Sequence, residues 1–181
     1  LPNRAKNQRQ IDGSALPGPA ERLAQSNRLS RMLIDAGWRQ IGLDHFARGG
    51  DTLATKELRR NFQGYTADSA DALIGFGASS ISQLPAGFAQ NAVTPGDYER
   101  RIEEQGLATA RGLKLTEDDR IRAFVIERLM CDFTFSAPAV LDRFGTSARP
   151  VVDEALALPA ADRDGFLAVT ADGFEVTPKG R

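Results

Sequence analysis

Proline and glycine divide this chain into short segments, and that division limits the length of its helices. Proline is favoured at the first position of a helix, and glycine commonly follows the last one. Pro19 and Gly37 enclose a segment whose apolar residues recur at helical spacing, so the sequence predicts a helix over 19–36. Pro95 and Gly106 enclose a second helical segment. Other elements must therefore fill the stretch between these two helices.

The stretch between the two helices has the pattern of strands and loops. Residues 38–46 alternate apolar and polar side chains, which predicts a strand that ends at Asp44 and His45. Further expected elements are an extended segment at 1–18, a helix at 51–59, a loop at 60–67 and a strand at 73–76. A helix followed by a strand is the repeat of an α/β barrel, whose active sites lie at the C-terminal ends of the strands. By analogy of fold, we place Asp44 and His45 at the edge of a site.

The pattern changes near residues 95–115, and we expect a domain boundary there that separates residues 1–105 from residues 106–181. In the second part, Thr116 and Asp119 have the spacing of a helix cap, and an apolar stripe follows them. The expected elements are helices at 117–131, 138–144 and 150–158 and a β-hairpin over 165–177. Three helices and a hairpin outline a mostly α, winged-helix-like domain.

Charge is distributed unevenly along the chain. Residues 1–60 contain 11 Lys and Arg against 6 Asp and Glu, whereas residues 61–181 contain 12 against 18, which leaves the whole chain at −1. The positive excess is either a fluctuation of the surface or a positive environment for a polyanionic ligand. Residues 146–164, the candidate recognition helix of a winged-helix domain, carry a net charge of −2. Phosphate binding needs positive charge, so we expect no nucleic-acid partner.

Cysteine and histidine are too few for a metal site. Cys131 is the only cysteine and His45 the only histidine, whereas a zinc site takes three or four protein ligands. Cys131 ends an amphipathic helix and is expected to be a buried structural thiol. A single cysteine is typical of a reducing compartment, and no apolar run approaches the roughly 20 residues that span a membrane. We therefore expect a cytoplasmic protein that binds neither a metal through this chain nor a membrane.

Three glycine-bearing blocks lie close together in the first part of the chain. They are Gly42-Leu43-Asp44-His45-Phe46-Ala47-Arg48 (the first block), Arg60-Asn61-Phe62-Gln63-Gly64-Tyr65-Thr66 (the second block) and Gly75-Phe76-Gly77-Ala78-Ser79-Ser80-Ile81-Ser82 (the third block). From the residues alone, His45 fits a hydrogen-bonded structural histidine. Phe62 and Gln63 fit the anchor of a turn, and Ile81 fits a buried position after a strand.

Together these blocks resemble one enzyme family, the oxygen-independent coproporphyrinogen III oxidases (dehydrogenases) of the radical S-adenosylmethionine (SAM) superfamily. The resemblance extends over essentially all 181 residues. The family signature, a C-x-x-x-C-x-x-C loop that holds a 4Fe–4S cluster, needs three cysteines and cannot be here. The resemblance therefore implies the C-terminal portion of the enzyme. It also implies an α/β fold in which residues 1–105 form the last strands and helices of a partial TIM-like radical SAM barrel.

The resemblance assigns roles to particular residues. In the family, the positions of Phe62, Gln63 and Ile81 contact SAM, of which two molecules are bound. The candidates for substrate binding are His45, Arg48 and Arg60. No residue of this chain is expected to be catalytic, because the resemblance places the cluster in an N-terminal region that the chain lacks.

The reaction implied by the resemblance is the conversion of coproporphyrinogen III to protoporphyrinogen IX in anaerobic haem and porphyrin biosynthesis. Two propionates are oxidatively decarboxylated to vinyl groups by radical chemistry that SAM and the 4Fe–4S cluster supply. The sequence indicates no electron donor, and this chain alone is expected to be inactive. The intact family is expected to be monomeric, whereas an incomplete barrel exposes strand edges that favour self-association.

The alternative is a related radical-SAM-like haem chaperone, which binds haem and transfers it. The C-terminal domains of the two classes look similar. The first and second blocks separate them, because both blocks match the dehydrogenase pattern.

Overall fold

The computed structural model describes residues 10–181, and residues 1–9 of the expected extended segment lie outside that range. The helices are α1 (Pro19–Asp35), α2 (Thr52–Thr55), α3 (Pro95–Gln105), α4 (Glu117–Cys131), α5 (Ala137–Phe144) and α6 (Arg149–Ala161), with short 3₁₀ turns at Gly13–Ala15 and Gly145–Ala148. The strands are β1 (Trp38–Ile41), β2 (His45–Arg48), β3 (Arg59–Asn61), β4 (Gly64–Thr66), β5 (Ile81–Leu84), β6 (Gly87–Asn91), β7 (Thr109–Lys114), β8 (Thr134–Ser136), β9 (Leu167–Val169) and β10 (Gly173–Val176).

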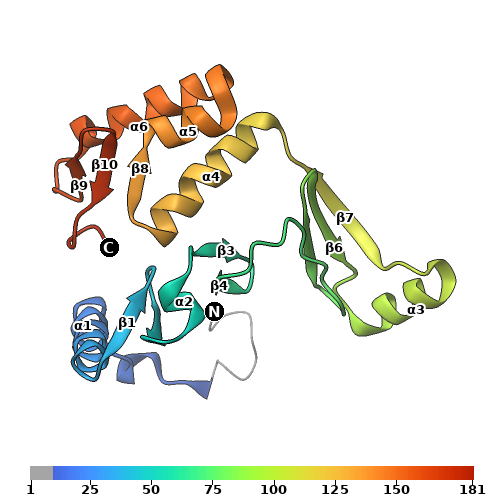
Figure 1. Cartoon of the computed structure of the whole chain (residues 1–181). Coiled ribbons are helices and arrows are strands. Elements are labelled where there is room, and N and C mark those ends of the chain that lie inside the picture. Colours follow the sequence, from blue (N-terminus) through green and yellow to red (C-terminus); the bar gives the residue numbers. More distant parts are fainter. Residues whose placement is uncertain (1–9) are drawn as a thin grey trace.

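These elements form three parts (Figure 1). The helices α4, α5 and α6 lie with the small sheet β8-β10-β9 at one end, and α1 lies with the hairpin β1-β2 at another. The sheet β5-β6-β7 projects to the side and carries α3 at its far end. The hairpin β3-β4 lies between these parts, beneath α4. The second block therefore occupies the centre of the molecule.

The helices that the sequence marks with caps are confirmed. The α1 helix begins at Pro19, and α3 begins at Pro95 and ends before Gly106, whose φ of 72° is the left-handed conformation of a helix stop. The α4 helix begins with a capping box in which Thr116 and Asp119 each bond the other's backbone N–H. Capping residues locate helix ends because they satisfy backbone groups that the helix leaves unpaired.

The prediction of one strand over 38–46 is wrong. The segment forms two antiparallel strands, β1 and β2, and Ile41 pairs with His45 across the turn. Gly42 has a φ of 55°, a left-handed conformation that reverses the chain and that glycine adopts readily. The alternating pattern fits a hairpin as well as it fits a single strand, because side chains alternate between faces in both.

The elements expected over 51–76 also differ in the structure. The helix ends at Thr55, and the expected loop at 60–67 lies largely in the β3-β4 hairpin. Leu73 makes only an isolated bridge to Gln83, so no strand forms at 73–76. The sequence also did not reveal β5, β6 and β7. Short apolar segments next to glycine are ambiguous between strand and turn, and only the partner strand decides between them.

The α/β class is confirmed, but every strand pairing in the described part of the chain is antiparallel. The parallel strands of a partial barrel are therefore not seen among residues 10–181, and the barrel stays a prediction. No helix within residues 10–181 has the length and apolar character needed to cross a membrane.

The C-terminal part has its own hydrophobic core. The expected hairpin, β9-β10, is present, and β8 adds a third strand to it. Phe174 of β10 stacks on Phe135 of β8 with ring centroids 5.1 Å apart, and α4 and α6 cover the pair with Ile121 and Val152. The three helices and the hairpin are as expected, whereas the winged-helix comparison stays a prediction.

Phe174→Ala should lower the free energy of unfolding by about 3–5 kcal/mol, because it leaves a cavity in a core where Phe174 is only 1% exposed. Urea unfolding followed by circular dichroism measures the change. Val169→Ala on the neighbouring strand is the control, because Val169 is exposed and its truncation should change stability by less than about 0.5 kcal/mol. Equal losses in the two variants would contradict this description of the core.

Candidate functional site

Tyr65 joins the first two blocks to the end of α4. Its hydroxyl accepts a hydrogen bond from the backbone N–H of Leu43 at 2.9 Å and donates one to the carbonyl of Met130 at 3.0 Å. The side chain is buried, so the hydroxyl needs both partners. One phenol therefore fixes the turn of the first block and the hairpin of the second block against a single helix.

Two of the three substrate-binding candidates contact the ring of Tyr65. The ring of His45 meets it edge-on, with centroids 5.0 Å apart, and the guanidinium of Arg60 lies 4.6 Å from its centroid. Asp44 lies beside His45, with its Oδ1 2.8 Å from Nδ1. Nδ1–H donates to this carboxylate, which orients the imidazole. The structure thus brings together His45 and Arg60, which are 15 positions apart in the sequence.

Arg48 is not part of this group. It lies at the other end of β2 from His45, about 10 Å along the strand, and residues three apart in a strand point to opposite faces. Its guanidinium instead lies 5.4 Å from the ring of Trp38, its partner across the hairpin. The geometry therefore favours Arg60 over Arg48 as a ligand-binding residue.

Arg60 has an unused hydrogen-bond donor. Within the described residues, its Nη1 is buried and makes no hydrogen bond. The residue lines a small pocket of about 130 Å³ together with Asn61 and Gln83, and Asp68 and Asp71 line the same pocket. An unpaired buried donor is costly, and a carboxylate is the group that a guanidinium binds best. The guanidinium of Arg60 is therefore the group here that suits an acidic ligand, whereas the two aspartates of the pocket oppose one.

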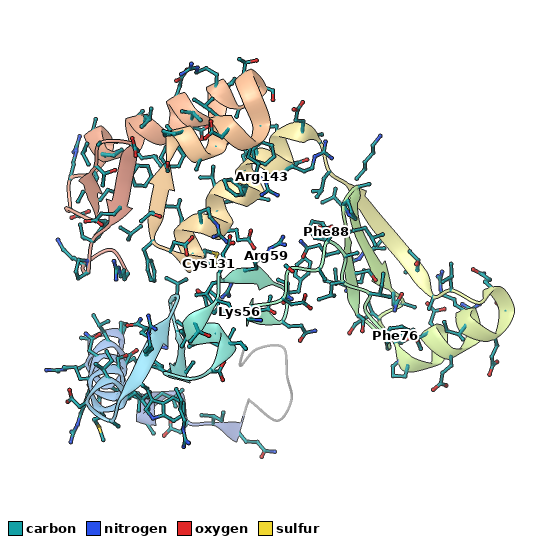
Figure 2. All side chains as sticks on the ribbon, in the orientation of Figure 1. Lys56, Arg59, Phe76, Phe88, Cys131 and Arg143 are labelled. Atoms are coloured by element: carbon teal, nitrogen blue, oxygen red, sulfur yellow. The ribbon has the colours of Figure 1, made fainter. Side chains whose placement is uncertain are left out.

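Phe62 and Gln63 form the turn between β3 and β4. Asn61 accepts a hydrogen bond from the backbone N–H of Gln63 at 2.8 Å, which tightens the turn. Phe62 is 57% exposed and packs edge-on against Phe88 of β6, with ring centroids 5.2 Å apart. Gln63 is exposed, so its amide is accessible to a ligand. The turn therefore presents one apolar and one polar side chain next to the β5-β6-β7 sheet, on which Figure 2 labels Phe88.

Ile81 lies on the sheet face that Phe62 contacts. Ile81 pairs with Gln90, and Gln83 pairs with Phe88, and directly opposed residues in an antiparallel pair point to the same face. Ile81 and Phe88 are thus on one face. The three residues that the family resemblance assigns to SAM come from two elements that touch through the contact between Phe62 and Phe88.

The loop of the third block is held by residues that the sequence did not single out. Asn91 Nδ2 donates to the carbonyls of Gly75 and Gly77, at 3.1 Å each, and the hydroxyl of Tyr98 accepts from the N–H of Gly77 at 3.2 Å. A Cβ on Gly75 would lie 2.9 Å from the carbonyl oxygen of Ile81. Nothing in the local sequence indicates these contacts, because they join three separate elements.

The sequence analysis also did not identify Glu127 and Arg128 of α4 as residues that hold the site. Glu127 Oε1 accepts the backbone N–H of Arg60 at 3.0 Å and lies 3.6 Å from the Nε of Arg59, a residue of β3 that Figure 2 labels. Arg128 donates to the carbonyl of Leu58 at 2.6 Å. It also pairs with Glu57 and Asp132. The sequence did contain a signal for Arg128. It lies four residues after Phe124, so a charged side chain stands on the apolar stripe of the helix.

Cys131 is the buried thiol that the sequence predicts. It packs with Ile41, Ala47 and Tyr65, and burial raises its pKa to about 11. The thiol is therefore protonated at neutral pH and is not a nucleophile. Within residues 10–181, no cluster of three or more His, Cys, Asp or Glu side chains is placed to hold a metal.

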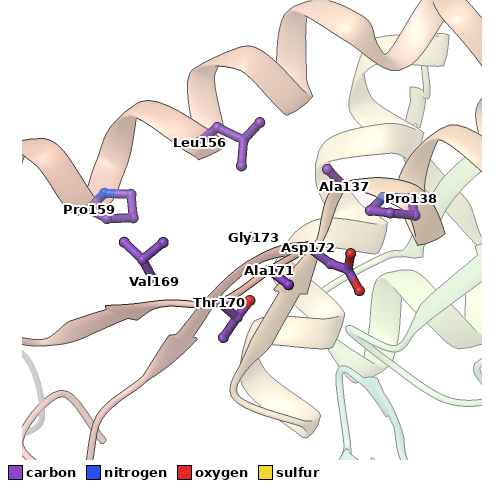
Figure 3. A pocket seen from close by; sticks show the side chains of 9 residues that line it. All are labelled: Ala137, Pro138, Leu156, Pro159, Val169, Thr170, Ala171, Asp172 and Gly173. Atoms are coloured by element: carbon purple, nitrogen blue, oxygen red, sulfur yellow. The ribbon is translucent and has the colours of Figure 1, made fainter.

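A second pocket lies in the C-terminal part, away from the three blocks (Figure 3). It has a volume of about 260 Å³ and an apolar lining that includes Pro138, Leu156, Pro159 and Val169. Asp172 is the only charged residue that lines it. The pocket therefore offers no group of polar side chains that would orient a substrate.

Tyr65→Phe should lower the free energy of unfolding by about 1–3 kcal/mol, because it keeps the ring but leaves Leu43 N–H and the Met130 carbonyl without a partner. Tyr98→Phe is the matched control, since its hydroxyl holds only the N–H of Gly77. Urea unfolding of both variants makes the comparison. A loss in Tyr98→Phe as large as that in Tyr65→Phe would show that Tyr65 is not the central anchor.

Comparison with known proteins finds relatives over the whole chain. Residues 115–181 match the HemN C-terminal domain. The whole chain is 42% identical over 185 residues to an oxygen-independent coproporphyrinogen III oxidase of Bradyrhizobium diazoefficiens and 40% identical to one of Cereibacter sphaeroides. It covers 41% of each of these relatives, so it spans about two fifths of their length.

A solved structure has the same fold. Coproporphyrinogen III oxidase (HemN) from Escherichia coli, described as a radical SAM enzyme, superimposes on the whole chain with a TM-score of 0.89 and 37% identity, over 43% of its own length. The chain is therefore related along its whole length to the oxygen-independent coproporphyrinogen III oxidases, and it carries their HemN C-terminal domain in residues 115–181.

Proposed function

We propose that the natural protein converts coproporphyrinogen III to protoporphyrinogen IX in porphyrin and haem biosynthesis. The observation that carries the proposal is the similarity of the whole chain to enzymes named for this substrate, at 42% identity and with a TM-score of 0.89 to a solved member. Each of two propionates would lose CO₂, one hydrogen atom from the β-carbon and one electron, which leaves a vinyl group. The haem chaperone is not proposed, because the curated relatives are named as oxidases.

The group around Tyr65 supports a carboxylate-binding role. The substrate has four propionates, and Arg60 offers a buried donor without a partner among the described residues. His45, oriented by Asp44, makes a T-shaped contact with the same aromatic ring. A fixed cation holds a propionate in place, and fixed geometry is a large part of what an enzyme contributes when a cofactor carries the chemistry.

The side chains at the turn of the second block, together with Ile81, are of the kinds that can bind SAM. Phe62 and Ile81 are apolar surfaces suited to an adenine or a methionine side chain, and Gln63 has an accessible amide for hydrogen bonding. We propose that these three residues contact SAM, of which two molecules bind in the intact enzyme. When bound together with a reduced 4Fe–4S cluster, SAM supplies the radical chemistry.

The residues of this chain cannot hold the 4Fe–4S cluster. Three thiolates are needed, whereas the sequence has only Cys131, and that thiol is buried among apolar side chains. We propose that another part of the protein holds the cluster. This part would also complete a radical SAM barrel, to which the resemblance assigns residues 1–105.

We also propose a domain division, with a winged-helix-like domain at the C-terminal end. A division between residues 105 and 106 separates β7 from β6, although the two strands pair along their length. A boundary after Lys114 keeps the sheet whole and coincides with the first residue of the HemN C-terminal domain match. The boundary after Lys114 therefore suits the fold better than a boundary between residues 105 and 106.

Gln63→Ala in the natural protein should reduce turnover of coproporphyrinogen III, with a raised KM for SAM, because the amide is lost from the SAM pocket. The assay follows protoporphyrinogen formation under anaerobic conditions with SAM and a reductant. Gln105→Ala, at the exposed end of α3, is the control. Absence of turnover by the cluster-loaded unmodified protein, together with tight haem binding, would move the assignment to the chaperone.

Arg60→Ala should raise the KM for coproporphyrinogen III about tenfold or more, since a charge-assisted bond to a propionate contributes roughly 1.5–3 kcal/mol. Arg48→Ala is the matched control, because Arg48 stacks on Trp38 and does not reach the ring of Tyr65. Steady-state kinetics on the two variants compare them. An equal effect of both changes, or none, would remove Arg60 from the proposed role.

A further inference from the structure

The last turns of α4 hold the β3-β4 hairpin, and we propose that Glu127 is a positioning residue for the turn formed by Phe62 and Gln63. The inference rests on the proposed function, because that function places SAM at this turn. Glu127 itself lies outside the three blocks, in the segment that matches the HemN C-terminal domain. A residue of the C-terminal part would thus set the geometry of a cofactor-binding turn in the first part.

Glu127 contacts the hairpin directly. Its Oε1 accepts the backbone N–H of Arg60 at 3.0 Å and lies 3.6 Å from Arg59 Nε. Its Oε2 lies 3.7 Å from Arg128 Nη2, so the carboxylate is itself held in place. A hydrogen bond from a backbone N–H to an ionised carboxylate is roughly twice as strong as one between neutral groups. The side chain is 20% exposed, which limits competition from water.

The hairpin is too small to set its own position. Each strand has three residues, and an isolated two-stranded hairpin is marginally stable in water. Its orientation therefore depends on what holds its strands from outside. Glu127 holds β3 at Arg60, and the Met130 carbonyl holds β4 at Tyr65, directly across the ladder.

This pair of anchors lies close to the turn. Arg60 pairs with Tyr65, and Asn61 and Gly64 form the next pair, which leaves only Phe62 and Gln63 beyond them. A shift at Arg60 is therefore transmitted to the turn across a single residue pair. Without Glu127, the remaining hydrogen bonds from α4 hold the hairpin at Leu58, before β3, and at Tyr65, so we expect β3 to be less firmly placed at Arg60.

Glu127 can be changed without disturbing a core. Tyr65 is buried in the cluster around Cys131, and Arg128 ties together Glu57, Leu58 and Asp132, so changes at either residue disturb packing as well as position. Glu127 belongs to neither buried cluster. Its loss is thus expected to affect the placement of the hairpin rather than folding.

The test compares Glu127→Ala with Glu127→Gln in the natural protein loaded with its cluster. Alanine removes the acceptor of the Arg60 N–H, whereas glutamine keeps a carbonyl oxygen that accepts it. We expect Glu127→Ala to raise the KM for SAM about tenfold, since small misplacements of binding groups carry large kinetic costs. Glutamine should restore most of the affinity. Glu154→Ala is the control, because Glu154 is an exposed carboxylate of α6 that pairs with Arg122 near the start of α4, away from the hairpin.

Hydrogen exchange gives a second measurement that does not depend on turnover. In Glu127→Ala, amide exchange should accelerate over residues 59–66, whereas α5 and α6 should keep their protection. Unchanged exchange over 59–66, or a loss of protection that extends equally through α5 and α6, would overturn the positioning role. An unchanged KM for SAM alongside faster exchange would overturn the link to SAM. Absence of turnover in the unmodified protein would count against the proposed function instead, and the exchange data would still decide whether Glu127 holds the turn.

Discussion

The hydroxyl of Tyr65 is the contact on which the arrangement of the first two blocks depends. It pairs with Leu43 on one side and Met130 on the other, and both partners are backbone groups. Gly42 makes this possible, because a Cβ there would lie 2.0 Å from the Tyr65 ring and its φ of 55° already disfavours other residues. The glycine of the first block and the tyrosine of the second block are thus two halves of one contact.

Most of the arginines near the blocks interact with other side chains of the same protein. Arg59 faces Glu127, Arg128 on the facing helix pairs with Glu57 and Asp132, and the Arg48 guanidinium lies over Trp38. Arg60 Nη1 is a buried donor that no described residue satisfies, and Arg128 Nε is another, although the other nitrogens of Arg128 are paired. A count of Lys and Arg along the sequence does not distinguish such a buried donor from arginines that are already paired.

The sequence predicted the elements whose ends are marked by local chemistry. Caps and helix stops located α1, α3 and α4, and the C-terminal hairpin was found as well. The hairpin at β1-β2 was read as one strand, because alternation does not report where a chain reverses. The sheet β5-β6-β7 was missed, since β7 is separated from β6 by a whole helix and its pairing is not local. Arg128 was overlooked although it interrupts an apolar stripe, and a charge at such a position signals a partner on another element.

The helix that holds the site does not belong to the segment that contains the site. Residues 127, 128 and 130 lie within the HemN C-terminal domain match, yet they bind Arg60, Leu58 and Tyr65, which lie far before it. A boundary drawn from sequence similarity therefore cuts through the contacts that position the second block. The α4 helix also carries Ile121 and Val125 into the C-terminal core, so one helix contacts both that core and the hairpin. The C-terminal part thus supplies the contacts that hold the hairpin carrying Phe62 and Gln63.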